Sequence, residues 1–209
     1  MEPDAVEIRA LGCLLEKQRT TPDTYPLSLN ALRAACNQTT NRDPVVSYDE
    51  ATIRDALDRL RRHGFTRLTS YHGSRTAKYR HLLDEALQIG PEEQAVLAVM
   101  MLRGPQTPGE LLQRTERLFP FPDAATLQAV VQRLIERELA TRYERRPGQR
   151  EERYGHLLGA EPDEPAAAAP AYAPAPPPAP RDDDRLDRLE REVAELRAEL
   201  ATLREELGA

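Results

Sequence analysis

The sequence lacks tryptophan altogether, and aromatic residues make up only 5% of its 209 positions. Any core is therefore mainly aliphatic, which favours small helical units. The sequence also lacks a run of eighteen or more apolar residues, so we expect no membrane-spanning helix. Its first ten residues have neither the basic nor the apolar segment of a secretion signal. We therefore expect a cytoplasmic protein.

Cysteine is scarce as well, with only Cys13 and Cys36 in the chain. Both fall at apolar positions of expected helices, without a CxxC motif or a nearby histidine at metal-ligand spacing. We expect buried, unpaired thiols. The sequence also has no Gly-rich phosphate loop, no HExxH and no GxSxG motif. These absences predict a non-enzymatic protein without a metal or another cofactor.

Charge is present in both signs but is unevenly distributed. The net charge is −6, yet residues 1–90 carry 13 basic and 12 acidic side chains and residues 91–159 carry 10 of each. Residues 160–209 carry 6 basic and 13 acidic side chains. The acidic excess thus belongs to the tail, and the net charge does not exclude nucleic acid as a partner of the remainder.

An internal repeat dominates the rest of the chain. The segment ATIRDALDRLRRHGFTRLTSYHGSRTAKYRHLL at 51–83 aligns with ATLQAVVQRLIERELATRYERRPGQREERYGHLL at 125–158. Apolar residues with 0, 3, 4, 7 spacing place one helical face towards a core in both copies. These residues are Ile53, Ala56, Leu57 and Leu60 in the first copy and Leu127, Val130, Val131 and Leu134 in the second. His81 and His156 are equivalent, which favours a structural over a catalytic role.

Each of these helices is followed by a segment whose period falls to two, as in a β-strand. In the first copy Ala77, Tyr79 and His81 alternate with Lys78 and Arg80. Tight turns are expected at His72-Gly73-Ser74 and at Pro147-Gly148. Each copy therefore predicts a helix followed by a β-hairpin.

Two further helices are predicted before each of these segments, at about 4–18 and 27–36 and at about 91–102 and 107–118. Ser28 or Pro26 is expected to open the second of them, and Thr107 with Pro108 the fourth. Three helices closed by a β-hairpin form a winged helix, a variant of the helix-turn-helix. The sequence thus predicts a mainly α, α+β fold with tandem winged-helix domains at 1–86 and 87–159. We expect the two to pack together through a short joint near Leu87–Gly90.

The last fifty residues predict two different segments. Residues 160–184 are rich in proline and alanine, which predicts a disordered, semi-extended linker. Residues 185–207 follow a 3, 4 spacing typical of a coiled coil, with complementary charges for a parallel dimer. An amphipathic helix folded back on the body is the alternative. The seam consists of Leu186, Leu189, Val193, Leu196, Leu200, Leu203 and Leu207.

Basic and polar residues gather where a winged helix meets DNA, on the third helix and the hairpin of each copy. The candidate contacts to duplex DNA are Arg59, Arg62, Arg75, Lys78, Gln128, Gln132, Arg133, Arg145, Arg146 and Arg150. The two glutamines could reach base edges, which makes the second copy the better candidate for recognising a DNA sequence. Acidic residues are interleaved in both copies, however, so a solvated surface remains the alternative.

A polar turn precedes the third helix of the first copy, with Asn37, Gln38, Asn41 and Arg42. Such side chains can reach a phosphate or the backbone of a protein partner. A long capping loop explains them equally well.

The segment LLEKQRTTPDTYPLSLNALRAACNQTTNRDPV, followed by KYRH, resembles the bacterial YceH family of uncharacterised proteins. The resemblance covers roughly residues 4–158. It implies tandem winged helices and brings no established activity, cofactor or binding residue. From the basic and polar residues of the third helices and hairpins and from the heptad spacing, we expect a DNA-binding, regulatory protein dimerised by its coiled coil. A scaffold that binds an unidentified protein partner, without DNA, is the alternative.

Overall fold

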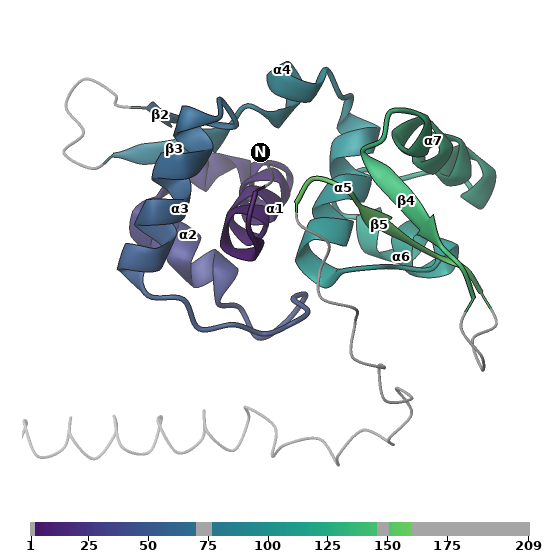
Figure 1. The fold of residues 1–209 in the computed structure, drawn as a ribbon, viewed down its shortest axis with the longest axis horizontal. Helices are drawn as coiled ribbons and strands as arrows, with labels where there is room; N and C mark the ends of the chain where they lie inside the picture. The colour runs from purple at the N-terminus through teal and green to yellow at the C-terminus, as the bar shows by residue number, and fades with distance from the viewer. Residues whose placement is uncertain (1–2, 70–76, 146–150, 160–209) are drawn as a thin grey trace, which may run out of the picture. The chain divides into compact units, whose positions relative to one another are not determined.

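The computed structural model describes residues 3–69, 77–145 and 151–159 (Figure 1). These residues belong to the first of the two units of the chain, 1–164, and the second unit is 165–209. The described part is mixed α+β, with seven α-helices and two small antiparallel sheets. The predicted linker and coiled coil lie outside it. The elements are α1 (Ala5–Thr20), η1 (Pro22–Thr24), β1 (Leu27–Ser28), α2 (Leu29–Cys36), α3 (Glu50–Arg62), β2 (Thr66–Thr69), β3 (Lys78–His81), α4 (Leu83–Leu87), α5 (Pro91–Arg103), α6 (Pro108–Thr115), α7 (Ala124–Glu136), β4 (Ala140–Tyr143) and β5 (Arg153–His156).

The order of three helices and a hairpin occurs twice, as the sequence predicts. We call α1, α2, α3, β2 and β3 the first repeat, and α5, α6, α7, β4 and β5 the second repeat. The predicted inner faces of α3 and α7 are buried at all four positions in each copy. The residues are Ile53, Ala56, Leu57 and Leu60, and Leu127, Val130, Val131 and Leu134.

Local capping explains where the helices begin. The side chain of Thr107 accepts a hydrogen bond from Glu110 N, and the Glu110 carboxylate accepts one from Thr107 N, with Pro108 at the first helical position. Ser28 caps α2 by accepting from Ala31 N. Asp49 and Asp123 cap α3 and α7 in the same way. The polar residues that precede each apolar pattern thus set the helix starts.

The sheets differ from the prediction by one strand. β2 pairs with β3 with Leu68 opposite Tyr79, and β4 pairs with β5 with Arg142 opposite Tyr154. In the first repeat β1 adds a third strand on the other side of β3, giving the order β1-β3-β2. This strand occupies Leu27 and Ser28, which the sequence assigns to the start of a helix. Tertiary pairing with β3 outweighs the local signal at these two residues.

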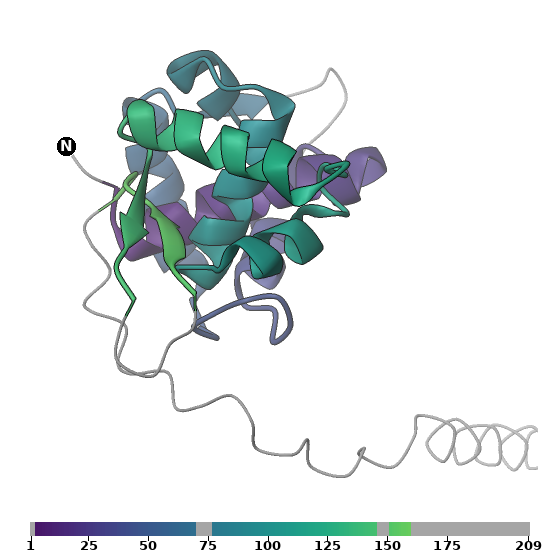
Figure 2. The same cartoon turned by 90° about the vertical axis from the view of Figure 1, so that its right-hand side faces the viewer.

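The two repeats pack through α1 and α5 and share one core (Figure 2). Every residue of α5 from Glu93 to Leu102 is buried, as expected of a central helix with neighbours on all sides. The helices approach closely at Gly12, where an added Cβ would lie 3.0 Å from the side chain of Leu102. Only a residue without a side chain fits this crossing without displacing its neighbour. The predicted packing of the two copies is therefore present in the described residues.

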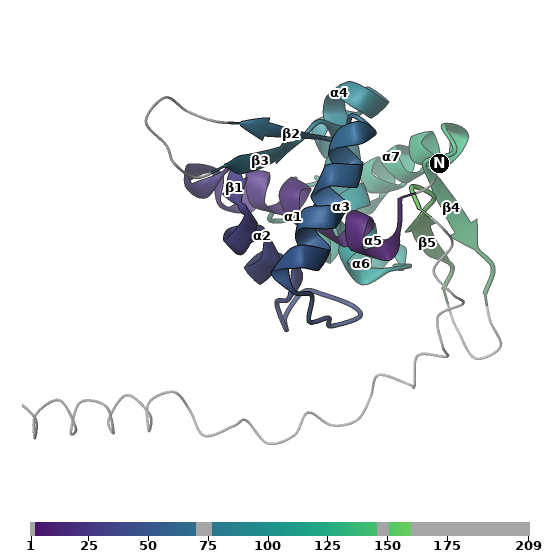
Figure 3. The ribbon, with the colours of Figure 1, turned by 60° about the vertical axis from the view of Figure 1, so that its left-hand side comes forward.

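The junction between the repeats contains a helix that the sequence did not predict. α4 follows β3 directly, and the chain then turns through Gln88 in a left-handed conformation with a φ of 51°. Gly90 N donates to the Glu93 carboxylate at 2.8 Å and opens α5. Figure 3 shows α4 between the β2–β3 hairpin and the second repeat. The predicted joint at Leu87–Gly90 is thus the short segment from the end of α4 to the start of α5.

Candidate nucleic-acid interface

The exposed face of α7 presents two uncharged amide side chains. Gln128 and Gln132 are exposed on it, and Ala129 lies between them. The only hydrogen bond of these two side chains within the described residues joins Gln132 Nε2 to Glu136 Oε1 at 3.3 Å. Both amides therefore keep donors and acceptors available to an incoming surface.

A cavity of about 340 Å³ lies beside this face, between α6, α7 and β5. Gln128 and Gln132 contribute to its wall, as does the ring of Tyr154 from β5. Burial, and then the neighbouring Glu152 carboxylate, raise the pKa of Tyr154, which keeps its phenol a neutral donor and acceptor. The apolar floor includes Leu111, Leu127 and Val131. Sequence reasoning missed this cavity because its walls come from three separate elements.

Arg133 directly follows Gln132 on α7 but is engaged within its own repeat. Its guanidinium is 3.1 Å from Glu92 and 3.8 Å from Glu93, at the start of α5. Arg137 binds the same Glu93 and the backbone carbonyls of Leu87 and Gln88. The side chain of Arg133 is still 47% exposed, so these pairs orient it more than they bury it. They nevertheless reduce the charge that it offers to a phosphate.

The first repeat has the same pairing of a third-helix arginine with carboxylates at the start of its first helix. Arg59, the equivalent of Arg133, lies 2.5 Å from Asp4 and 3.4 Å from Glu7 at the start of α1. Glu7 also accepts a hydrogen bond from Asp4 N, just as Glu93 accepts one from Gly90 N. The same carboxylate in each repeat therefore caps a helix and holds an arginine of the third helix. This recurrence indicates a structural use of Arg59 and Arg133, which the sequence proposes as DNA contacts.

The outer face of α3 largely neutralises its own charges. Arg54 pairs with Glu50, and Arg61 lies 3.2 Å from Asp58. Arg62 is exposed and has no ion pair within the part of the chain that the structure describes. Lys78 lies half-buried at the start of β3. The structure therefore leaves fewer free cations on the first repeat than its sequence suggests.

The hairpin of the second repeat keeps exposed arginines near α7. Arg142 on β4 is 62% exposed and lies 3.6 Å from Glu152, and Arg145 is exposed just beyond the strand. β4 packs against α7 (Figure 1). The three other hairpin candidates, Arg75, Arg146 and Arg150, lie outside the described residues. Among the candidates of the second repeat, Gln128, Gln132 and Arg145 are thus exposed and without an ion pair within the described residues, whereas Arg133 is exposed but paired with Glu92.

The polar turn at 37–42 is held by contacts within the chain. The side-chain amide of Asn37 accepts a hydrogen bond from Tyr48 N at 2.9 Å and donates one to the Tyr48 carbonyl at 2.8 Å. The Arg42 side chain is fully buried and binds both carboxylate oxygens of Glu16, at 3.0 and 2.6 Å. Gln38 accepts a further bond from Arg42 at 2.8 Å. Of the two explanations for this turn, the arrangement favours a loop stabilised by its own side chains.

Two histidines and both cysteines are withdrawn from solvent, His81, Cys13 and Cys36 fully and His156 in part. His81 is buried, with Nε2 2.6 Å from Gln18 Oε1, and burial lowers its pKa to about 4. Burial likewise lowers the pKa of His156 to about 4. Cys13 and Cys36 are buried and free, as predicted.

Within residues 3–69, 77–145 and 151–159, no group of three or more His, Cys, Asp or Glu side chains could hold a metal ion. No helix in these segments is long and apolar enough to cross a membrane.

Comparison with known proteins places these features in a family. The sequence matches the family described as "Protein of unknown function, DUF480" over residues 4–149. It is 49% identical to a UPF0502 protein of Geotalea uraniireducens (strain Rf4), over 92% of this chain and 89% of that protein. It is 49% identical to a UPF0502 protein of Pelobacter propionicus, over 95% and 91% of the two chains. A UPF0502 protein of Solibacter usitatus is 45% identical, over 93% and 92%. The predicted resemblance to a family of uncharacterised bacterial proteins is confirmed.

Proposed function

The chain belongs to the DUF480 family, and because the family description names no activity, we propose a function from the geometry of the second repeat. The protein is a non-enzymatic pair of tandem winged helices that binds duplex DNA and acts as a regulator. α7 enters the major groove, and the β4–β5 hairpin contacts the adjacent backbone. The observation that carries this proposal is the exposed, uncharged Gln128 and Gln132 beside the exposed arginines of the hairpin.

The chemistry of these side chains suits a groove. A glutamine amide can donate to and accept from one adenine edge, so Gln128 and Gln132 supply base contacts. Arg145 supplies a phosphate contact, which adds affinity without sequence preference. Ala125 and Ala129 are exposed and small, which allows the α7 backbone to approach the bases.

The second repeat is preferred over the first because the corresponding surfaces differ in free charge and polarity. At the positions of Gln128 and Gln132, α3 carries Arg54 and Asp58, and both take part in ion pairs with neighbours on the same helix. Opening such pairs to reach DNA costs part of the binding free energy. α7 presents amides at these positions and has no such pairs to break.

Fluorescence anisotropy on a duplex selected for tight binding by the full chain tests the proposal. Gln128→Ala with Gln132→Ala should weaken binding to the selected duplex by roughly tenfold or more while leaving random-sequence DNA nearly unaffected. Arg145→Gln should weaken both and reduce the slope of log affinity against log salt by about 0.9. The matched control is Arg54→Gln, an exposed arginine of the first repeat. The proposal fails if full-length protein shows no salt-dependent affinity for any duplex.

A protein adaptor is the second candidate, and a specific observation favours it. Arg59 and Arg133 are turned towards carboxylates of their own repeats. The cavity beside α7 has an apolar floor that could take a side chain of a protein partner. Under this alternative Gln132→Ala and Leu111→Ala alter capture of a protein while DNA binding is absent in the wild type. The anisotropy measurement therefore separates the two candidates.

The proposal also includes a dimer. Residues 185–207 form a parallel coiled coil in which two copies bring four winged helices onto one DNA molecule. This element lies outside the described residues, so it rests on the heptad spacing and on charge complementarity. A duplex with two half-sites is then expected to bind more tightly than one with a single half-site.

A further inference from the structure

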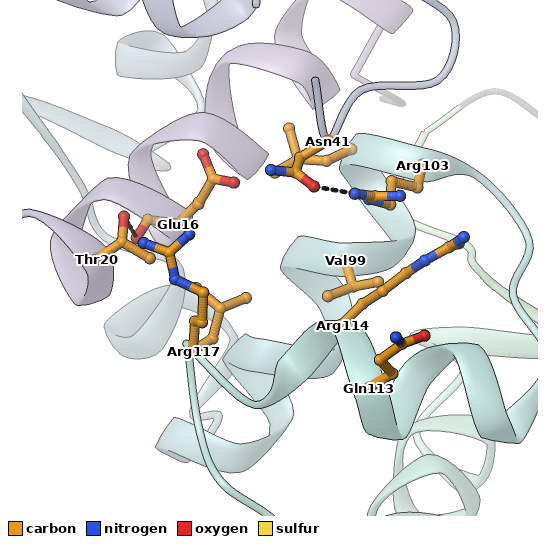
Figure 4. Close-up of a pocket in the computed structure, with 10 residues that line it drawn as sticks. Glu16, Thr20, Asn41, Val99, Arg103, Gln113, Arg114 and Arg117 are labelled. Atoms are coloured by element: carbon orange, nitrogen blue, oxygen red, sulfur yellow. Dashed lines mark hydrogen bonds between the residues drawn. The ribbon is translucent and has the colours of Figure 1, made fainter. Parts of the chain in front are cut away.

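A second cavity, of about 390 Å³, lies between the two repeats (Figure 4). Its walls come from α1, from the loop after α2, and from the C-terminal ends of α5 and α6. The proposed DNA interface on α7 contributes none of its lining residues. They are Glu16, Thr20, Asn41, Val99, Leu102, Arg103, Gln113, Arg114, Arg117 and Leu118.

Three arginines of the second repeat meet at this cavity. Arg103 is the last residue of α5, Arg114 lies in the last turn of α6, and Arg117 follows that helix. In Figure 4 the guanidinium groups of Arg103 and Arg114 lie near each other, and Arg117 extends towards Glu16 and Thr20 on the opposite wall. Burial is the main cause of the lowered pKa of Arg103, and the like charges of Arg114 and Arg42 lower it further.

The protein neutralises little of this charge. Arg103 donates to the amide oxygen of Asn41, and Arg114 donates to the amide oxygen of Gln106. Glu110 lies 3.5 Å from Arg114 but also accepts from Arg153 at 3.2 Å. In the part of the chain that the structure describes, Arg117 has neither an ion pair nor a hydrogen bond. The first two arginines are thus positioned mainly by neutral amides, which orient a guanidinium without cancelling its charge.

The carboxylate of the cavity wall is already engaged elsewhere. Glu16 binds the buried Arg42 through both oxygens and lies 3.6 Å from Lys17. It therefore has little capacity to neutralise Arg117 as well. The cavity as a whole keeps an excess of positive charge, with Thr20, Asn41 and Gln113 as further polar groups.

We propose that this cavity binds a small phosphate-bearing compound. Arg103 and Arg114 hold the phosphate, since two guanidinium groups match its oxygens in pairs. Arg117 contacts the compound from the second side, and Val99, Leu102 and Leu118 contact its less polar portion. The volume falls within the range of small-molecule sites, which often lie between domains. Because the walls come from both repeats, the bound compound stabilises their packing.

Isothermal titration calorimetry of the full chain with inorganic pyrophosphate tests this site. Wild-type protein should bind in a saturable manner with one site per chain. Arg114→Gln combined with Arg117→Gln should weaken binding by at least about tenfold, because each replacement removes a charged hydrogen-bond donor. Pyrophosphate should raise the Tm of the wild type and not that of the double variant. Arg117→Gln alone, at an exposed position, should weaken binding without changing the Tm of the unliganded protein.

Two controls decide whether the effect belongs to this cavity. Arg54→Gln removes an exposed arginine of the first repeat and should leave pyrophosphate affinity unchanged; an equal loss there would show nonspecific attraction and overturn the site. Absence of saturable binding up to about 10 mM would overturn it too. If duplex DNA displaces pyrophosphate and the double variant weakens DNA binding by the same factor, the phosphate belongs to DNA and the small-molecule assignment is wrong. Gln128→Ala should affect DNA binding alone, so the two proposals can fail independently.

Discussion

At the scale of single residues, the most consequential contact is the buried pair of Arg42 and Glu16. The Arg42 guanidinium also donates to the carbonyl of Ala35 and to Gln38, so nearly all of its donors are used. These bonds fasten the loop after α2 to α1. A side chain that looks like a surface arginine in the sequence is therefore part of the internal structure.

Arg42→Met should destabilise the protein by about 3–5 kcal/mol, because Glu16 then loses its main partner in a largely buried position. The free energy of unfolding in urea measures the effect. Arg54→Met is the matched control, since it breaks an exposed pair with Glu50 and should cost less than about 1 kcal/mol. Equal losses in the two variants would contradict the role given to the buried pair.

The lowered pKa values of His81 and His156 predict how stability depends on pH. Burial lowers the pKa of His81 to about 4 from its ordinary value of 6.5, so between these two pH values the unfolded chain binds more protons than the folded chain. Stability should therefore fall as the pH decreases below about 6.5. At pH 5 the loss from His81 amounts to about 2 kcal/mol relative to neutral pH.

Urea unfolding of wild type and His81→Gln at pH 7 and pH 5 measures this dependence. The variant should lose a smaller part of its stability between the two pH values, even if it is less stable at both. His156→Gln should have a similar effect in the second repeat, and the double variant should have the smallest pH dependence. A wild-type stability that is constant between pH 7 and pH 5 would refute the interpretation.

At the scale of elements, the ends of α3 and α7 offer an internal comparison. Both helices are followed by a residue in the left-handed conformation, Gly64 with a φ of 76° and Glu138 with a φ of 56°. The next residue then donates to a carbonyl inside the helix, as Phe65 does to Leu60 and Leu139 to Leu134. Glycine adopts this conformation without the steric cost that a glutamate incurs.

Glu138→Gly should therefore stabilise the protein by about 0.5–1 kcal/mol, and Gly64→Ala should destabilise it by about 1 kcal/mol. Thermal and urea unfolding measure both changes. Glu136→Gly, two residues earlier in the helix, is the control and should be destabilising by about 1 kcal/mol. Stabilisation by both glycine variants, or by neither, would contradict the argument from backbone conformation.

The elements also show what the sequence could predict. The 0, 3, 4, 7 spacing and the capping residues are local signals, and they predicted the helices to within a few residues and the order of the hairpins. α4 was missed because it is a short helix that ends in a turn. β1 was missed because its partner strand, β3, is distant in the sequence. The ion pairs of Arg59 and Arg133 were missed for the same reason, since Glu7 and Glu93 lie 52 and 40 positions away in the chain. Charge clusters in a sequence therefore overestimate free surface charge.

At the scale of the whole molecule, the shared core and the arginine cavity both arise where the repeats meet. α5 is buried because it packs against α1 as well as against its own repeat. No periodicity within one repeat could indicate the cavity, because Asn41, Arg103 and Arg117 come together only after the repeats have packed. The duplication thus creates a surface that neither copy has alone.

Under the dimer proposal, residues 185–207 extend this organisation to a second copy of the chain. If residues 185–207 form a parallel coiled coil, Leu196 and Leu200 lie in its seam, where a charge would be buried without a partner. Leu196→Asp with Leu200→Asp should convert a dimer into a monomer in sedimentation velocity. The control is Ala198→Asp, which places the same charge at an outward position and should leave the dimer intact.

A monomeric wild type would refute the coiled-coil proposal, and so would a dimer that persists in the double variant. The alternative, a helix folded back on its own chain, predicts a monomer whose stability falls in the same double variant. Because the substitutions lie outside residues 3–159, the dimer model predicts unchanged pyrophosphate binding. DNA binding should then weaken most on duplexes with two half-sites, since only these use both copies at once.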